Sequence, residues 1–273
     1  MCAATVCFSF SFTLVKGLQD AGLTVFQAIL FRQTLGIVIF MPMIIGSGFA
    51  PLRTAVPAQH FSRAALGFLG MYTGYYSLSL INIADSVALQ FTLPIFTMFS
   101  AVLILGEKIY FHRLIATLVG FAGVLIIVRP GFAELNLGIL FALLASAFHS
   151  VSDTYSRYLA RYDGHQTIMV LNFAYTIPLA ALPAAIFWVP ISSEIWPQLI
   201  VFCLMGISAQ YCLTRSFGIA EASLVSPILF FRLPIVAVIA FYAFNQQTEI
   251  WTWVGAGVIF IATTWMARIE VRK

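Results

Sequence analysis

The segment SPILFFRLPIVAVI (residues 226–239) contains twelve residues that are apolar or proline, yet it places Arg232 between Pro227 and Pro234. An apolar environment disfavours a charged group by several kcal/mol or more. Each proline inside a helix also removes one backbone hydrogen bond. The segment therefore predicts a helix that kinks near the two prolines, in surroundings that compensate for a buried charge.

The composition is that of a membrane protein. Of the 273 residues, 61% are hydrophobic and only 9% are charged, against about 25% charged residues in a typical soluble domain. Apolar runs recur along the whole chain, and each can cross a hydrocarbon layer about 30 Å thick. We therefore predict an all-α integral membrane protein. Its net charge of +4 is scattered without forming a basic patch, so nucleic acid is not an expected partner.

Polar or turn-rich breaks divide the chain into ten apolar segments, which predict ten transmembrane helices. The segments cover residues 1–18, 24–46, 62–82, 85–105, 111–129, 136–158, 165–189, 195–217, 221–244 and 250–268. Cytoplasmic connections of membrane proteins are enriched in Lys and Arg. If the N-terminus is cytoplasmic, ten basic residues fall inside and only Lys16 and Arg129 fall outside, with Arg32 and Arg232 in the membrane. Both termini are therefore expected in the cytoplasm.

An internal repeat relates the two halves of the chain. Short motifs recur in the same order, at an offset of 136 or 140 residues. The pairs are Gly70 and Gly206, Tyr75 and Tyr211, IAD (83–85) and IAE (219–221), and TLPI (92–95) and RLPI (232–235). The period corresponds to five helices, an odd number, so the second half would be inverted relative to the first. Inverted repeats occur in secondary transporters, whose sites lie near the midplane; chance similarity between apolar helices is the alternative.

Two longer stretches resemble the EamA domains of the drug/metabolite transporter superfamily. ADSVALQFTLPIFTMFSAVLILGEKIYFHRLIATLVGFAGVLIIVRPG (84–131) is similar to the first domain, and GISAQYCLTRSFGIAEASLVSPILFFRLPIVAVIAFYAF (206–244) to the second. The resemblance implies two inverted five-helix repeats, residues 1–131 and 132–273, around a central cavity. It also implies a multi-pass protein of the bacterial cytoplasmic membrane that transports small metabolites. The second half departs from the family pattern at NQQTE (245–249), where a glycine–glutamate pair is usual.

Two arginines within predicted spans are candidates for substrate binding. Arg232 lies roughly 16 Å from the cytoplasmic start of its segment, near the middle of the membrane. It either lines a cavity or pairs with a carboxylate, for which Asp153 is nearest in depth. Arg32 lies about 12 Å from the outer face, where it either lines an outer vestibule or extends to the interface. Intramembrane ionisable residues usually mark substrate or ion pathways.

The sequence HSVSDTYSR (149–157) places His149, Asp153 and Arg157 on one helical face, because residues four apart are neighbours on a helix. One interpretation is a relay of His149 and Asp153 that couples transport to protons, since histidine changes charge near neutral pH. The alternative is a structural pair of Asp153 and Arg157, with His149 bonded to the backbone of a neighbouring helix.

Several uncharged side chains complete the set of candidates. MYTGYYSLS (71–79) puts Tyr72 and Tyr76 on one face, while Tyr75 points elsewhere. This face suits either a cavity wall with phenol hydroxyls or ordinary packing. Weaker candidates for substrate binding are Gln90, Gln210 and Tyr211.

Together these features favour a gradient-driven secondary transporter that works by alternating access. We find no Walker A, GxSxG or HExxH motif and no Cys/His cluster with metal-ligand spacing, so no catalytic residue, cofactor or metal is expected. The family resemblance implies export of amino acids or related compounds. The alternatives are a nucleotide-sugar or phosphate-ester exchanger of the same superfamily, and a membrane enzyme or non-transporting scaffold. The glycine-rich face Gly120–Gly123 is compatible with a homodimer or with packing inside one chain.

Overall fold

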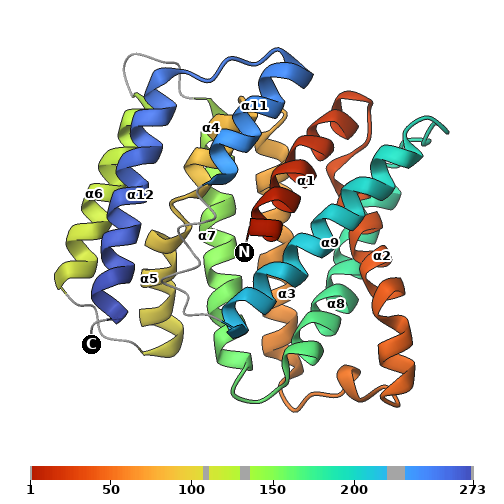
Figure 1. Cartoon of the computed structure of the whole chain (residues 1–273). Coiled ribbons are helices and arrows are strands. Elements are labelled where there is room, and N and C mark those ends of the chain that lie inside the picture. Colours follow the sequence, from red (N-terminus) through yellow and green to blue (C-terminus); the bar gives the residue numbers. More distant parts are fainter. Residues whose placement is uncertain (1, 107–110, 130–135, 220–230, 272–273) are drawn as a thin grey trace.

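The computed structural model describes residues 2–106, 111–129, 136–219 and 231–271, and the secondary structure within them is helical (Figure 1). The first half contains α1 (Cys2–Asp20), α2 (Val25–Gly46), the short 3-10 helix η1 (Ala50–Leu52), α3 (Pro57–Ser77), α4 (Ile83–Gln90), α5 (Leu93–Leu105) and α6 (Phe111–Val128). The second half contains α7 (Leu137–Leu159), α8 (His165–Ile186), α9 (Trp196–Ile219), α11 (Arg232–Phe244) and α12 (Ile250–Val271). The prediction of an all-α chain is confirmed for these residues.

Each of the ten predicted segments contains a helix, but not every helix is a complete span. In the described part of the chain, five helices are long and apolar enough to cross a membrane alone: α1, α2, α7, α8 and α9. The helices α4 and α5 make a sixth span if they are taken together, with a bend of 41° between them. The apolar stretches found in α6, α11 and α12 are shorter. Ten membrane spans therefore stay a prediction.

The break between α4 and α5 falls at the first of the two repeated LPI motifs. Pro94 lacks the N–H that would bond to the Gln90 carbonyl, so α4 ends at Gln90 and α5 begins at Leu93. At the second motif, α11 begins at Arg232, and Pro234 lies in the first turn, where no N–H is required. Pro227, the other proline at which a kink is predicted, lies outside the described residues.

The helices pack in matching pairs. At one edge of the bundle α2 packs against α8, and at the opposite edge α6 packs against α12 (Figure 1). Between these edges α3 contacts α7 and α8, just as α9 contacts α1 and α2. In the same way α5 contacts α7, α11 contacts α1, and α4 meets α11. When the helices are counted by the five-helix repeat, each of the contacts named here has a counterpart in the other half or is its own counterpart.

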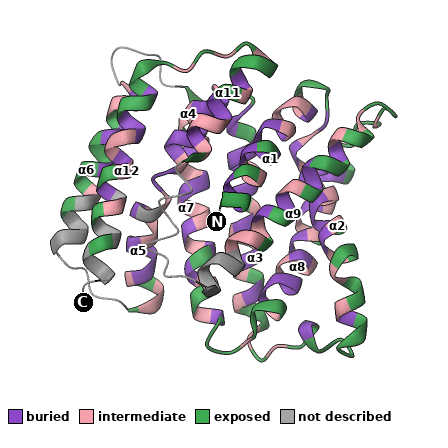
Figure 2. Cartoon of the chain, in the orientation of Figure 1, coloured by how far each residue is buried: buried purple, intermediate pink, exposed green. Residues whose placement is uncertain are grey.

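Buried residues concentrate where helices face one another (Figure 2). Many of the exposed residues are large and apolar. Leu18, Ile29 and Phe202 are fully buried in the main core. Leu103, by contrast, is 85% exposed, and Leu182 is 71% exposed. An apolar exterior of this kind suits a chain whose outer surface is surrounded by lipid.

Close backbone contact joins α6 to α12. A Cβ atom added at Gly255 would lie 2.6 Å from the Gly123 carbonyl oxygen, and one added at Gly123 would lie 2.8 Å from the Gly255 carbonyl oxygen. Small residues allow such approach between membrane helices. A Cβ at Gly120 would likewise meet Ile95 at 2.5 Å. The Gly120–Gly123 face is thus used inside the chain, which removes the argument for a homodimer that rested on it.

Asp163 lies in the α7–α8 connection and binds residues of the α2–α3 connection and of the start of α3. These segments lie at the same end of the bundle, the lower end in Figure 1. The Asp163 carboxylate accepts hydrogen bonds from the Thr54 hydroxyl at 2.5 Å and from His60 Nε2 at 2.8 Å. Burial alone would raise the pKa of the Asp163 carboxyl, but these two bonds hold that pKa below its ordinary value. Arg63, one turn further along α3, donates from Nε to the Ser156 hydroxyl at 2.5 Å. These contacts join the two halves of the chain at this end.

The α6–α12 contact predicts that Gly255→Ala destabilises the protein. The new methyl group would collide with a backbone oxygen that cannot move aside, at an expected cost of about 1–3 kcal/mol. The matched control is Gly257→Ala on the same helix, because a Cβ there meets nothing within 4 Å. Thermal unfolding in detergent should show a lower Tm for Gly255→Ala and an unchanged or higher Tm for Gly257→Ala. Equal Tm values for the two variants would contradict the close contact.

Asp163→Asn should lower stability at neutral pH by about 1–3 kcal/mol, since it removes a charge-assisted hydrogen bond. A carboxyl whose pKa is lowered by folding stabilises the protein above its unfolded pKa, near about 4. That stability is lost as pH falls through the still lower folded pKa. The Tm difference between wild type and variant should therefore be full at pH 7 and shrink below about pH 4. Glu194→Gln, at an exposed site, is the control; a difference that is independent of pH would exclude this role of the carboxylate.

Candidate functional site

Arg32 projects from α2 into the interior of the bundle and is 8% exposed. Its Nη1 atom donates to the Tyr75 hydroxyl oxygen at 2.9 Å and to Met71 Sδ at 3.3 Å. Its Nη2 atom donates to the Gly206 carbonyl oxygen at 3.3 Å. A Cβ at Gly206 would lie 2.6 Å from Arg32 Nε, so the glycine makes the room for this side chain. Arg32 therefore does not extend to the outer interface; it joins α2, α3 and α9.

Arg232 lies over aromatic rings of α1. Its Cζ atom is 4.0 Å from the centroid of the Phe12 ring and 5.7 Å from that of Phe8. Its Nε and Nη2 atoms are buried and have no hydrogen-bond partner in the described part of the chain. Phe12 packs edge-to-face on Tyr75, with ring centroids 5.8 Å apart. The two arginines thus belong to one group, Arg32, Arg232, Tyr75, Phe12 and Phe8, which we call the arginine cluster.

Within the described ranges, the arginine cluster has no carboxylate at ion-pairing distance. The ion pairs of Lys and Arg formed there, Lys16–Asp20 and Arg129–Glu249, lie at helix ends. The predicted pairing of Arg232 with Asp153 is not formed, because the charges that act on Asp153 are those of Arg63 and Arg157. Depth in the membrane matched the two residues, but depth does not fix the direction in which a side chain leaves its helix.

His149 lies beside the arginine cluster. Its ring packs on Gly70, where an added Cβ would lie 2.9 Å from the ring. The charges that act on it are those of Arg32 and Arg232. Asp153, one turn further along α7, is exposed and belongs to the separate group with Arg63. The predicted relay therefore joins two different electrostatic neighbourhoods, and its role in proton coupling stays a prediction.

Tyr75, rather than Tyr72 or Tyr76, is the tyrosine of the arginine cluster. It is 4% exposed, and it packs against Phe202 at a centroid distance of 5.9 Å. Tyr72 and Tyr76 stack on one another at 5.7 Å, and Tyr72 also stacks on Phe26 at 4.9 Å. Helical spacing predicted that Tyr75 lies on a different face of α3 from Tyr72 and Tyr76, but it did not show which of these faces meets Arg32. The repeat could have identified Tyr75, since Gly70 and Tyr75 are both landmarks of it.

The other polar candidates lie elsewhere in the bundle. Gln90 ends α4, and its Nε2 atom donates to the Ser86 hydroxyl at 3.3 Å. Gln210 is half-buried one turn beyond Gly206 on α9, and its neighbour Tyr211 is 43% exposed. Their part in substrate binding, like that of Tyr72 and Tyr76, stays a prediction.

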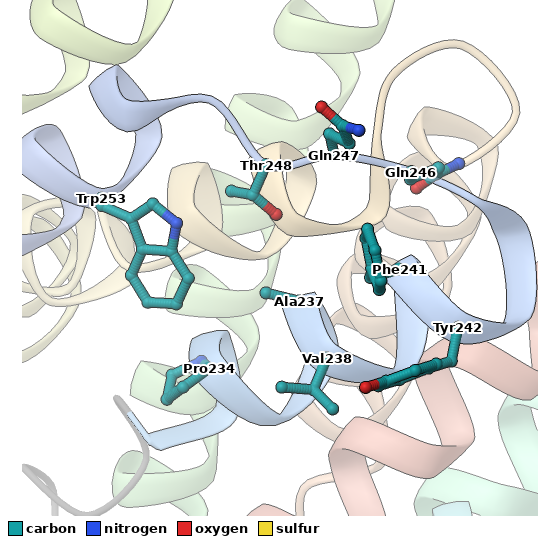
Figure 3. Close-up of a pocket in the computed structure, with 9 residues that line it drawn as sticks. All are labelled: Pro234, Ala237, Val238, Phe241, Tyr242, Gln246, Gln247, Thr248 and Trp253. Carbon is teal, nitrogen blue, oxygen red and sulfur yellow. The ribbon is translucent and has the colours of Figure 1, made fainter.

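A separate pocket of about 450 Å³ lies between α11 and the beginning of α12 (Figure 3). Its lining comes from α11, the following connection and α12: Pro234, Ala237, Val238, Phe241, Tyr242, Gln246, Gln247, Thr248 and Trp253. It contains no residue of the arginine cluster, and Tyr242 at its edge is 82% exposed. An outward, largely apolar hollow suits lipid chains better than a polar solute. The arginine cluster is therefore the candidate site for a solute.

Comparison with known proteins adds to this description. The S-adenosylmethionine uptake transporter of Rickettsia prowazekii is 27% identical over 91% of this chain and 84% of its own length. The riboflavin transporter of Brucella anthropi is 30% identical over 87% of this chain and 86% of its own. One solved crystal structure shares the fold, with a TM-score of 0.67 over 99% of this chain and 96% of that chain at 17% identity. The model of the EamA-like transporter family matches residues 1–129 and 136–268, and the chain therefore belongs to the EamA-like transporter family.

Proposed function

We propose that this protein takes up a small metabolite across the bacterial cytoplasmic membrane by gradient-driven alternating access. One observation carries the proposal: Arg32 of the first half is buried against Tyr75 of the same half and Gly206 of the second. A charge is costly to bury within a membrane and usually marks a transport pathway. Membership of a transporter family supports the activity, and the sequence offers no ATP-binding motif, so a solute or ion gradient would supply the energy.

The architecture we propose is two inverted repeats, residues 1–131 and 132–273, each with five spans and with both termini cytoplasmic. The matching helix contacts support it, as do the helix starts at both LPI motifs. Gly70 and Gly206, which are counterparts in the repeat, also have similar roles. Each accommodates a polar side chain from another helix, His149 in one case and Arg32 in the other.

Alternating access requires contacts at each end that can open in turn. At the proposed cytoplasmic end, Asp163 holds Thr54 and His60. At the proposed outer end, the Ile83 N–H donates to Gln246 Oε1 at 3.1 Å and the Thr252 hydroxyl donates to Asp85 at 2.5 Å. Arg129 also pairs with Glu249 there. We propose that these two groups of bonds break alternately while the arginine cluster stays between them.

The relatives change the expected direction of transport. Export of amino acids was implied by family resemblance alone. The relatives above, by contrast, are named for S-adenosylmethionine uptake and for riboflavin. Uptake of an organic metabolite is therefore the direction that we propose. His149 and Asp153 remain our candidates for proton coupling, because Asp153 is exposed near Arg63 and Arg157 while His149 lies beside the arginines of the cluster.

The proposed orientation predicts which side of the membrane each end faces. A cysteine introduced at Arg53 should be labelled only from the cytoplasm, and one at Glu194 only from outside, because the two exposed positions lie at opposite ends of the bundle. The measurement is labelling with an impermeant maleimide in a variant whose four native cysteines are replaced. Labelling of both positions from the same side would contradict the inverted repeat.

Purified protein in liposomes should accumulate at least one solute from a mixture of riboflavin, S-adenosylmethionine, amino acids and small organic acids, measured by mass spectrometry. The flux should respond to an imposed pH gradient, and Asp153→Asn should remove that response because the variant cannot exchange a proton there. Asp20→Asn, which changes an exposed aspartate at the end of α1, is the matched control.

Two outcomes would count against these proposals. If no solute entered the protein-containing liposomes above the level of empty ones, the transport function would be wrong. If the Asp153→Asn variant still followed the gradient, Asp153 would be a structural partner of Arg63 and Arg157 and not a coupling group.

A further inference from the structure

The neighbours of the two buried arginines are all uncharged in the described part of the chain. Arg32 donates to a phenol oxygen, a thioether sulfur and a backbone carbonyl. Arg232 meets the faces of Phe12 and Phe8. Hydrogen bonds to neutral acceptors and contacts with aromatic rings stabilise a guanidinium group, but they leave its charge in place. The arginine cluster therefore holds two positive charges, linked through Tyr75 and Phe12, with no negative charge among its residues.

The unpartnered atoms of Arg232 have a particular arrangement. Nε and Nη2 are the two donors along one edge of the guanidinium plane, and both are buried without a partner among the described residues. Two parallel N–H groups on one edge match the two oxygens of a carboxylate or of a phosphate. Arg32 Nε is likewise buried and unpartnered. These are the donors that an acidic group would require.

Tyr75 supplies a further donor between the arginines. Its hydroxyl oxygen accepts from Arg32 Nη1 at 2.9 Å, so its own proton is left to donate to another acceptor. The edge-to-face contact of Tyr75 with Phe12 places this phenol next to the ring on which Arg232 lies. Arg232 is also the first residue of α11, where the helix dipole adds positive potential.

We propose that the arginine cluster is an anion site, and that the transported metabolite is a small organic acid with an apolar or aromatic body. Its carboxylate or phosphate group binds the Nε–Nη2 edge of Arg232 and accepts from the Tyr75 hydroxyl. Its body lies against the rings of Phe8 and Phe12. A solute with net positive charge is repelled by both arginines. This inference rests on the proposed transport function and narrows it to a class of substrate.

The test uses pairs of probes that differ only in the acidic group: phenylacetate against phenylacetamide, and riboflavin 5′-phosphate against riboflavin. Binding to the purified full chain in nanodiscs should favour the anion of at least one pair by about tenfold or more. The pair that shows the difference tells whether the site takes a carboxylate or a phosphate. Equal binding within both pairs, or no anion binding at all, would overturn the inference.

Variants locate the effect in the cluster. Arg232→Gln should weaken binding of the preferred anion by about tenfold or more, and Tyr75→Phe by about threefold. Arg232→Lys keeps the charge but not the paired donors, so its affinity should lie between those of wild type and Arg232→Gln. Arg53→Gln, an exposed arginine in the α2–α3 connection, is the matched control and should bind as wild type does. An Arg232→Gln variant that is folded and binds the anion as wild type does would overturn the inference.

Measuring solute uptake by liposomes distinguishes failure of this inference from failure of the proposed transport function. Liposomes that take up the preferred anion equally well with wild type and with Arg232→Gln would leave the transporter in place and remove the anion site. Liposomes that take up no solute at all would remove the transport function itself.

Discussion

Arg32 and Arg232 bury two positive charges around Tyr75, and much of the surrounding structure follows from the need to accommodate them. Gly206 has no side chain where Arg32 crosses α9, and its carbonyl oxygen accepts one of the guanidinium hydrogen bonds. Phe12 presents its ring to the other guanidinium group at 4.0 Å. A larger residue at position 206 or a polar one at position 12 would remove these accommodations. Five helices meet here, α1, α2, α3, α9 and α11, and they come from both halves of the chain.

The position of the arginine cluster between two sets of end contacts gives the fold its proposed mechanism. Asp163 joins the halves at one end, and Gln246, Thr252 and Glu249 join them at the other. These contacts are polar, and a hydrogen bond to a charged group such as the Asp163 carboxylate contributes only about 1.5–3 kcal/mol net. They can therefore break and re-form during a transport cycle. The α6–α12 edge, which is held by backbone contact at Gly123 and Gly255, is suited to remain rigid.

Much of the fold could be predicted from the sequence because it depends on local properties. Apolar runs indicated the helices, and Pro94 explains why α4 and α5 are separate. The burial of Arg32 and Arg232 also follows from their place within apolar runs. The membrane spans were harder to predict, because a helix can be apolar without being long enough to cross alone, as with α11.

The partners of the buried charges could not be predicted, because they depend on how helices rotate about their own axes. The spacing of Tyr72 and Tyr76 suggested a cavity wall, but it is Tyr75, on the neighbouring face, that meets Arg32. Asp153 matched Arg232 in depth yet lies near Arg63 and Arg157. The Asp163 contacts were missed for a different reason: they join two connections 109 residues apart in sequence, and no local pattern marks such a pair.

The most direct test of the central claim is an electron cryo-microscopy structure of the full chain with a transported solute bound. We predict density for an acidic group within hydrogen-bonding distance of Arg232 Nε and Nη2 and of the Tyr75 hydroxyl, with the rest of the solute against Phe8 and Phe12. Solute density in the outward pocket beside α11 and α12, with both arginines still without an anionic partner, would contradict the account.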